Sequence, residues 1–330
     1  MSAPPPDRAG AAIQPLRTAV VHIGHDREVP PVDVVLPAGV LAFAGRGPEW
    51  AAFVDRLPRL ARELVDDWGL VADGAPRHGH GSLVLPVRRD GEPAVLKLAF
   101  PDDEGEHEAL ALQRLGGEGA VQLLSADPHR RALLLERLHV TDLDSLPVLE
   151  ACEVVAGLYS RLHVPPPPQL RSVGSYLDRW TPALRALPRD APVPHRMVEQ
   201  ALSLVAGLFT ADGPVVMVHG DLHYDNVLAA EREPWLAIDP KPMAGDPHYE
   251  LAPMLWNRWE EAVATGNLRF ALRRRFHTLV DAAGLDEELA RDWVVVRMVY
   301  NALWELEDRA GAPDRDWLTT CIAVAKAVQD

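Results

Sequence analysis

The sequence predicts an α+β protein with two lobes, because the pattern of apolar residues changes once along the chain. Up to about Leu138, short apolar runs alternate with Gly, Pro and Asp turns, which is typical of strands. After Leu138 the apolar residues recur every three or four positions, which indicates helices. We expect a small lobe with an antiparallel sheet plus helices over residues 33–137, and a larger, mainly helical lobe over 138–330. Residues 1–32 read as a weakly ordered extension, in which Thr18–Ile23 could add one strand.

The first lobe is predicted to open on an amphipathic helix. Apolar residues over Pro48–Trp68 fall at i, i+3, i+4 and i+7, and Pro58 inside this pattern predicts a kink or two shorter helices. Asp90 and Gly91 form a hairpin-turn signal between two strands. One helix is expected at Glu106–Leu115, and the strands are expected at Ser82–Val87, Pro93–Phe100, Ala120–Ser125 and Arg131–Arg137.

The second lobe is predicted to be helical, with one interruption. Two short apolar strands, Val215–Val218 and Trp235–Asp239, enclose a polar loop between helices. The four prolines at Pro165–Pro168 must end a helix. The expected helices are Ser145–His163, Leu170–Leu187, His195–Thr210, Pro247–Thr265, Leu268–Ala283, Glu287–Arg309 and Arg315–Val328.

The composition excludes several classes of protein. The chain has 33 Lys plus Arg against 48 Asp plus Glu, a net charge of −15, so nucleic acid and anionic membrane surfaces are not expected partners. No apolar stretch reaches the length of a membrane span, and residues 1–10 lack the apolar core of a secretion signal. Cys152 and Cys321 are too far apart to suggest a disulfide framework or a metal site, which fits a reducing cytoplasm.

The densest polar cluster lies in the loop after the first of the two short strands. It contains His219, Asp221 and Asn226 in the spacing H-x-D-x-x-x-x-N, and Asp239 follows 13 residues after Asn226. Phosphoryl transfer from ATP needs one carboxylate that takes the proton of the acceptor hydroxyl, and an amide oxygen with a second carboxylate that hold Mg²⁺. The cluster therefore predicts Asp221 as the catalytic base, with Asn226 and Asp239 as the metal ligands.

Two other interpretations of this loop remain open. His219 and His223 are four residues apart and have acidic neighbours, which a metal-dependent hydrolase would also show, although that spacing aligns two histidines only on a helix. The loop could also be a polar surface segment with a buried histidine.

A lysine that reaches the nucleotide phosphates is expected on a strand of the first lobe. Lys97 is the only charged residue of the run 94–100, although an edge-strand lysine that points to solvent would look the same. Glu104, Glu106 and Glu108 follow at the start of the next helix. We expect Glu108 to pair with Lys97, with Glu104 as the second choice; the alternative is a solvated helix face.

Two further segments could contact the nucleotide. Gly79, Gly81 and Ser82 lie in a tight turn whose backbone N–H groups could bind phosphate, although an ordinary hairpin would have the same composition. If the lobes clamp ATP, backbone groups around Glu136 to Leu138 would contact the adenine edge. The alternative is that this strand is simply part of the core.

These motifs resemble the aminoglycoside phosphotransferases, a branch of the protein-kinase-like fold, and more narrowly the streptomycin 6-phosphotransferase and hydroxyurea phosphotransferase group. The resemblance covers about residues 33–310 and rests on the run 219–255 and on segments near Trp68, Glu106 and Gly119. It implies a bilobal kinase-like fold, ATP and Mg²⁺ as cofactors, and the roles already named for Asp221, Asn226, Asp239 and Lys97.

Two positions depart from the pattern of related kinases. Pro240 and Lys241 follow Asp239 where protein kinases have Phe-Gly, so no activation-loop switch is expected. Glu250 stands where many relatives have an Asp that steadies the catalytic loop, and its longer side chain leaves that role open.

The acceptor is the least determined part of the prediction. A small-molecule kinase is favoured over a protein kinase, because no Asp-Phe-Gly to Ala-Pro-Glu segment exists, and over an inactive nucleotide-binding module, because no catalytic part is missing. We expect a cationic aminoglycoside of the streptomycin type rather than neutral hydroxyurea or an unidentified metabolite. Candidate acceptor-site residues are Glu260, Glu261, Glu305, Glu307 and Asp308, with Trp256, Trp259 and Trp304 as walls.

Overall fold

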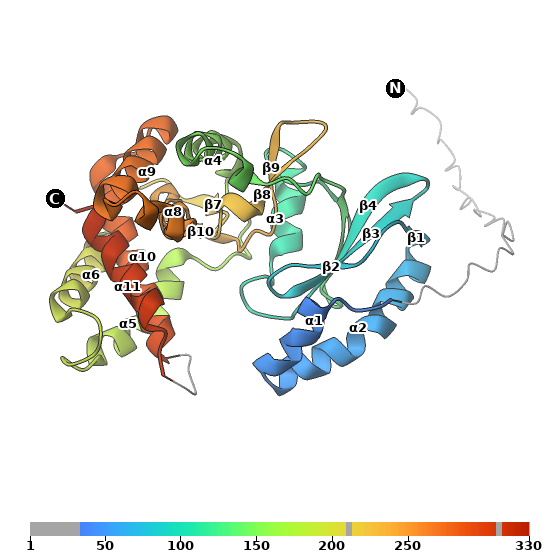
Figure 1. Cartoon of the computed structure of the whole chain (residues 1–330), viewed down its shortest axis with the longest axis horizontal. Helices are drawn as coiled ribbons and strands as arrows, with labels where there is room; N and C mark the ends of the chain where they lie inside the picture. The colour runs from blue at the N-terminus through green and yellow to red at the C-terminus, as the bar shows by residue number, and fades with distance from the viewer. Residues whose placement is uncertain (1–33, 209–212, 308–311, 330) are drawn as a thin grey trace, which may run out of the picture. The chain divides into compact units, whose positions relative to one another are not determined.

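The computed structural model describes residues 34–208, 213–307 and 312–329, which form a sheet lobe followed by a helical lobe (Figure 1). The expected extension 1–32 and its strand at Thr18–Ile23 lie outside the described residues. Among the described helices, none is both long and apolar enough to cross a membrane. Cys152 and Cys321 are buried free thiols.

The sheet lobe is built on a six-stranded antiparallel sheet. Its strands pair in the order β1-β3-β4-β6-β5, and β2 adds to β3. Asp90 and Gly91 both have positive φ, 53° and 86°, and form the two-residue turn between β3 and β4 that the Asp-Gly signal predicts. The strands are β1 (Leu70–Ala72), β2 (Arg77–His78), β3 (Ser82–Arg89), β4 (Glu92–Ala99), β5 (Leu123–Asp127) and β6 (Ala132–Glu136).

Helix α2 (Pro48–Asp67) buries its apolar face, including Leu57, Ala61 and Leu64. It runs without a break through Pro58, so the expected alternative of two shorter helices is wrong. Proline removes one backbone hydrogen bond, while each large apolar side chain that is fully buried contributes about 1.5–3 kcal/mol. The packed face therefore outweighs the lost bond. Before α2 come α1 (Ala38–Ala42) and the 3₁₀ turn η1 (Phe43–Arg46); after β4 comes α3 (Glu108–Leu115).

The helical lobe is organised around α10 (Glu287–Glu307), which is buried over most of its middle. Trp293 and Tyr300 on this helix are among the largest fully buried side chains. The other long helices are α4 (Val148–Leu162), α5 (Val173–Ala186), α6 (His195–Leu208), α9 (Leu268–Ala283) and α11 (Arg315–Ala327), and η2 (Leu143–Ser145) precedes α4.

The predicted helix Pro247–Thr265 is wrong in its continuity. The segment forms η4 (Pro247–Glu250), α7 (Ala252–Trp256) and α8 (Trp259–Ala264). The break falls at Arg258, which has φ 52° and whose guanidinium lies 5.0 Å from the ring centre of Tyr224 and 2.9 Å from Leu146 O. These tertiary contacts hold Arg258 in a left-handed conformation that helical periodicity does not reveal.

Two small antiparallel ribbons frame the polar loop of the helical lobe. β7 (Val216–Val218) pairs with β10 (Met243–Gly245), and β8 (Val227–Ala229) pairs with β9 (Trp235–Ala237). The 3₁₀ turn η3 (Tyr224–Asn226) lies between β7 and β8. The ends of four strands therefore meet where the sequence places its catalytic cluster.

Candidate active site

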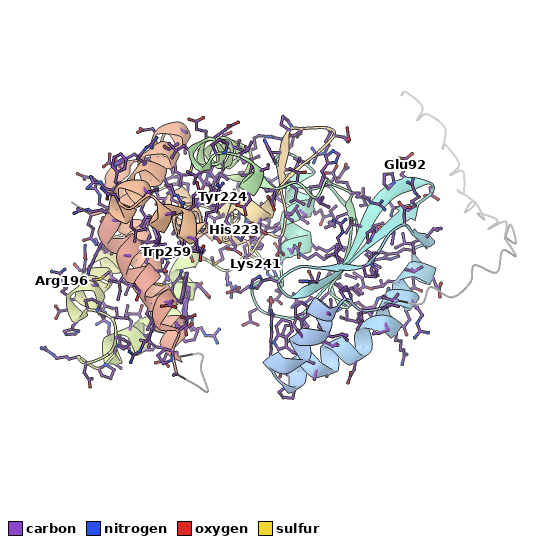
Figure 2. All side chains as sticks on the ribbon, viewed as in Figure 1. Glu92, Arg196, His223, Tyr224, Lys241 and Trp259 are labelled. Carbon is purple, nitrogen blue, oxygen red and sulfur yellow. The ribbon has the colours of Figure 1, made fainter. Side chains whose placement is uncertain are left out.

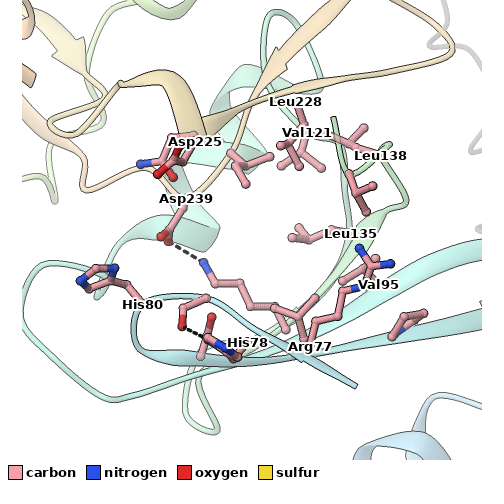
Figure 3. Close-up of a pocket in the computed structure, with 18 of the residues that line it drawn as sticks. Arg77, His78, His80, Val95, Val121, Leu135, Leu138, Asp225, Leu228 and Asp239 are labelled. Atoms are coloured by element: carbon pink, nitrogen blue, oxygen red, sulfur yellow. Dashed lines mark hydrogen bonds and ion pairs between the residues drawn. The ribbon is translucent and has the colours of Figure 1, made fainter. Parts of the chain in front are cut away.

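A cavity of about 1100 Å³ is lined by residues of both lobes. Part of its wall is aliphatic: Val95 and Leu135 come from the sheet lobe and Leu228 comes from β8 (Figure 3). Lys97, Asp221 and Asp239 also line the cavity, together with other charged residues. A cavity that combines aliphatic and charged residues suits a purine nucleotide, whose base is flat and whose phosphates are anionic.

Lys97 occupies a central position in the sheet and not an edge. Its strand β4 lies between β3 and β6, so the edge-strand alternative is wrong. Its Nζ lies 2.6 Å from Glu108 Oε1 and 2.6 Å from Asp239 Oδ1; the latter pair is drawn in Figure 3. Glu104 is not its partner within 4.0 Å. Burial alone would lower the pKa of Lys97, but the two carboxylates outweigh it and hold that pKa above its usual value.

Asp239 follows β9 with a left-handed backbone, φ 56°. Lys241 Nζ is 3.2 Å from the same Oδ1 that accepts from Lys97. Burial would raise the pKa of Asp239, yet the two lysines hold it well below its usual range, so the carboxylate is ionised at neutral pH.

The catalytic loop requires glycine at position 220. Gly220 has φ 84°, and a Cβ there would lie 2.3 Å from Lys241 O. His219 Nε2 donates to Ile238 O at 2.9 Å, and His219 Nδ1 accepts from the Asp221 N–H at 3.3 Å. Burial lowers the pKa of His219 to about 3, so the ring is neutral and serves to fix the loop.

Asp221 follows Gly220 in the catalytic loop, and its side chain is about one-third exposed. Burial by the surrounding protein raises its pKa above the usual value. A carboxylate with a raised pKa is a stronger base once ionised, which is the property that proton removal from an alcohol requires.

Two buried residues of the helical lobe tether this loop. Glu250 Oε1 accepts from the Gly220 N–H at 3.1 Å, so the longer side chain does reach the loop. Arg297, on α10, donates to Tyr249 O at 2.9 Å and also to Gly220 O. The sequence analysis missed Arg297. The available signal was a single cation inside the apolar stretch 293–300, because a buried cation needs compensating acceptors.

Asn226 and Asp239 fit a divalent metal ion. The Asn226 Nδ2 donates to Asp221 O at 2.8 Å, which assigns the orientation of the amide. The amide oxygen of Asn226 is therefore available as a ligand for a cation. Asn226 and Asp239 therefore offer an amide oxygen and an ionised carboxylate, which are the ligand types that Mg²⁺ prefers. In the described ranges, no group of three or more His, Cys, Asp or Glu side chains is arranged to hold a metal.

The glycine turn contributes only part of the expected set. Gly79 and Ser82 line the cavity, whereas Gly81 lies against the ring of Trp50, 3.1 Å from the position of a Cβ. Glu136 also lines the cavity, but its carboxylate turns to Arg232 at 2.7 Å. The Glu136 side chain is therefore engaged by Arg232, and the contact of nearby backbone groups with an adenine edge stays a prediction.

A second cavity, of about 160 Å³, is also lined by Asp221. Trp256 and Trp304 line it as walls, and Trp259 does not. Among the acidic candidates within the described ranges, Glu260, Glu261, Glu305 and Glu307 are not lining residues, and Asp308 lies outside those ranges. The periodicity that places these residues on helices does not say which helix faces the loop. The complete lining set is Glu104, Arg171, Tyr176, Gly220, Asp221, Lys241, Met243, Tyr249, Trp256, Arg297, Asn301 and Trp304.

The two-lobed fold is that of kinase-like phosphotransferases. A choline kinase from Streptococcus pneumoniae superposes with a TM-score of 0.57 at 13% identity, covering 83% of this chain and 99% of that one. An aminoglycoside phosphotransferase in complex with ADP and hygromycin B superposes with a TM-score of 0.56 at 16% identity, covering 82% and 98%.

Sequence comparison is more specific than these superpositions. Residues 67–309 match the family described as aminoglycoside/hydroxyurea antibiotic resistance kinase. The chain is 44% identical over 293 residues to a streptomycin 6-kinase of Streptomyces glaucescens, covering 85% of this chain and 94% of the relative. It is 40% identical over 284 residues to a hydroxyurea phosphotransferase of Kitasatospora aureofaciens, covering 84% and 80%. The chain therefore belongs to the aminoglycoside/hydroxyurea antibiotic resistance kinase family and is a phosphotransferase.

Proposed function

We propose that this enzyme transfers the γ-phosphoryl group of ATP to a hydroxyl of an aminoglycoside of the streptomycin type, with Mg²⁺ as cofactor. The observation that carries the proposal is the position of Asp221, which lines both the nucleotide-sized cavity and the smaller second cavity. A base between two cavities can take a proton from an acceptor in one while phosphate is presented from the other.

In the proposed mechanism Asp221 accepts the proton of the acceptor hydroxyl. The freed oxygen attacks the γ-phosphorus in line, the bond from that phosphorus to the bridging oxygen breaks, and ADP leaves. Lys97 anchors phosphate oxygens through a position fixed by Glu108. Asn226 and Asp239 would hold Mg²⁺, which supplies charge neutralisation at the phosphates. Glu250 and Arg297 keep the loop of Asp221 in place.

The nucleotide is proposed to lie with its base among the aliphatic residues around Val95, Val121 and Leu228. Backbone groups near Leu138 would contact the adenine edge, and the turn at Gly79 and Ser82 would lie over the phosphates. In the same proposal the lobes divide at residues 137 and 138, and the enzyme acts in the cytoplasm, which the free thiols Cys152 and Cys321 support.

The acceptor assignment rests on the relatives and has one named competitor. Two streptomycin 6-kinases, 44% and 42% identical to this chain, support the aminoglycoside, whereas the hydroxyurea phosphotransferase, at 40%, supports the smaller acceptor.

An ATP-consumption assay with streptomycin, other aminoglycosides and hydroxyurea tests this, with the Asp221→Ala variant as the blank. We expect kcat/KM to be highest for streptomycin and to fall with added salt, because the net charge of −15 attracts a cation and the Debye length shrinks from about 10 Å at 0.1 M to about 3 Å at 1 M. Turnover of hydroxyurea without turnover of streptomycin would reverse the assignment.

A further inference from the structure

Glu104 is the one predicted partner of Lys97 that the structure places elsewhere. It lies in the loop between β4 and α3 and lines the second cavity together with Asp221. The loop is held on both sides: Asp102 Oδ1 accepts from the Gly105 N–H at 2.6 Å, and the His107 ring lies within hydrogen-bond distance, 2.9 Å, of Gln169 O in the helical lobe. The sheet lobe thus contributes a positioned carboxylate to a cavity whose other walls are helical.

The cations around this cavity are already engaged. Lys241 is bonded to Asp239, and Arg297 is bonded to main-chain oxygens of the loop. Arg171 lies over the ring of Tyr176, 4.7 Å from its centre. Glu104 itself has no Lys, Arg or His nitrogen within 4.0 Å among the described residues. It is therefore a carboxylate of the cavity that is free to pair with a ligand.

The environment of Glu104 favours such a pairing. Its side chain is exposed to solvent, yet partial desolvation by the surrounding protein raises its pKa, and the nearby carboxylates of Asp102 and Asp221 act in the same direction. Lys241 and Arg171 lower the pKa of Glu104, but they do not cancel the free-energy cost of ionising this carboxyl group in its surroundings. A cationic group of a bound molecule would offset the cost, because an opposite charge stabilises the ionised carboxylate.

The rest of the cavity wall fits a molecule that also carries oxygen atoms. The amide of Asn301 lines the same space and makes no hydrogen bond with another described residue. The rings of Tyr176 and Trp256 also line the cavity, and each already has an arginine over one face, Arg171 and Arg297 respectively. The carboxylate of Glu104 and the amide of Asn301 together suit an amino or guanidino alcohol.

We propose that the second cavity binds the acceptor and that Glu104 recognises a cationic group of it, which makes Glu104 a specificity-determining residue. The proposal rests on the phosphotransferase function above and extends it to the acceptor site. A cavity of about 160 Å³ is smaller than the roughly 300–1,000 Å³ typical of sites that enclose a whole ligand. It would therefore hold the part of the acceptor that carries both the reacting hydroxyl and a cationic group, with the remainder outside.

The test compares Glu104→Gln with Glu106→Gln. Glu106 is an exposed carboxylate two residues further along the same loop that does not line either cavity, so its variant controls for the loss of one charge. Both variants are assayed with streptomycin, which carries guanidinium groups, and with hydroxyurea, which is neutral. Isothermal titration of streptomycin in the presence of ADP measures binding without turnover.

We expect Glu104→Gln to raise KM and Kd for streptomycin roughly tenfold, the order expected for one charge-assisted contact near solvent, and to change kcat less than about threefold. KM for ATP and any turnover of hydroxyurea should stay unchanged, and Glu106→Gln should match the wild type. The salt dependence of streptomycin capture should also become weaker in Glu104→Gln alone.

The outcomes separate this inference from the proposed function. Streptomycin turnover with equal KM in both variants would overturn the role of Glu104 and leave the function intact. Turnover of a cationic alcohol other than an aminoglycoside, with the same dependence on Glu104, would support the role and overturn the assigned acceptor. If the wild type binds and phosphorylates neutral acceptors only, both are overturned.

Discussion

The two cavities that Asp221 lines are built differently. The larger one combines aliphatic and charged residues, and its buried lysine is paired at short range: Lys97 lies 2.6 Å from both Glu108 and Asp239. The smaller one is lined mainly by polar and aromatic residues from separate stretches of the chain, and it leaves Glu104 unpaired within the described residues. The relatives are named for different acceptors, streptomycin and hydroxyurea, so the acceptor site is the part we expect to differ between them.

This comparison separates the expected effects of substitutions. Changes in the larger cavity should alter nucleotide and metal dependence for every acceptor. Changes in the smaller cavity should alter the choice of acceptor while the nucleotide is bound as before. Asp221 and Trp256 line both cavities. Substitutions at these two residues should therefore affect phosphoryl transfer from the nucleotide to the acceptor.

The largest effect is expected for Asp221→Ala. A general base contributes about 10²–10⁴-fold, so kcat should fall by at least that order. The affinity for ATP should remain nearly intact, because Asp221 acts on the acceptor. Single-turnover kinetics and titration with ATP measure the two quantities, and weakened ATP binding with preserved turnover would show that the base lies elsewhere.

Substitution of the metal ligands should come next. Asp239→Ala and Asn226→Ala should both raise the Mg²⁺ concentration needed for half-maximal activity, with Asp239→Ala the more severe, because a carboxylate brings a full charge and an amide only a dipole. Metal titrations at saturating ATP decide the order. Unchanged Mg²⁺ dependence in both variants would favour a purely structural loop.

Arg297→Met tests the tether of the loop rather than either cavity wall. It leaves the main-chain oxygens of Tyr249 and Gly220 without a buried donor, and each such loss costs about 1–3 kcal/mol. We expect a lower free energy of unfolding in urea and a lower kcat, with KM for ATP little changed. Arg291→Met is the matched control, since Arg291 lies on the same helix away from both cavities and should cost less. Equal losses of stability and kcat in both variants would contradict the tether.

The sequence predicted four residues that the structure places around the larger cavity, Lys97, Asp221, Asn226 and Asp239, and their catalytic roles stay predictions. The spacing of Asp221 and Asn226 is set by one loop, and Lys97 was found as a lone charge in an apolar strand. The second cavity, proposed as the acceptor site, could not be predicted in this way. Its residues come from positions 104 to 304, and only the packing of the chain brings them together.

The fold also contains some elements that local sequence predicts and others that only tertiary contacts determine. The Asp-Gly turn and the long helix α9 follow local rules, and α9 has the predicted ends Leu268 and Ala283. The short strands β1 and β2 were not predicted, because two or three residues give no measurable periodicity. Nor was the break at Arg258, where contacts with Tyr224 and Leu146 override helical propensity.

The effect expected for Glu250→Gln is on stability, and it appears as a dependence on pH. Burial raises the pKa of Glu250 from 4.5 to about 7, so between these values the folded protein keeps a proton that the unfolded chain has lost. This residue's contribution to stability is therefore present below about pH 4.5 and is lost as the pH rises to about 7. Glutamine cannot titrate and keeps an oxygen for the Gly220 N–H. The stability of the variant relative to the wild type should grow from pH 4.5 to 7 in urea unfolding, and a constant difference would contradict this assignment.

The use of lysine in this chain has a practical consequence for chemical labelling. The sequence contains three lysines, and two of them, Lys97 and Lys241, are held against Asp239 as charged ammonium groups. Only neutral amines react with acylating reagents, so both should react slowly, and bound nucleotide should slow them further. Lys326 is exposed on α11 and does not line either active-site cavity. Besides the α-amino group, an amine-reactive dye or a surface linker should therefore attach at one side chain, far enough from the chemistry to leave the enzyme active.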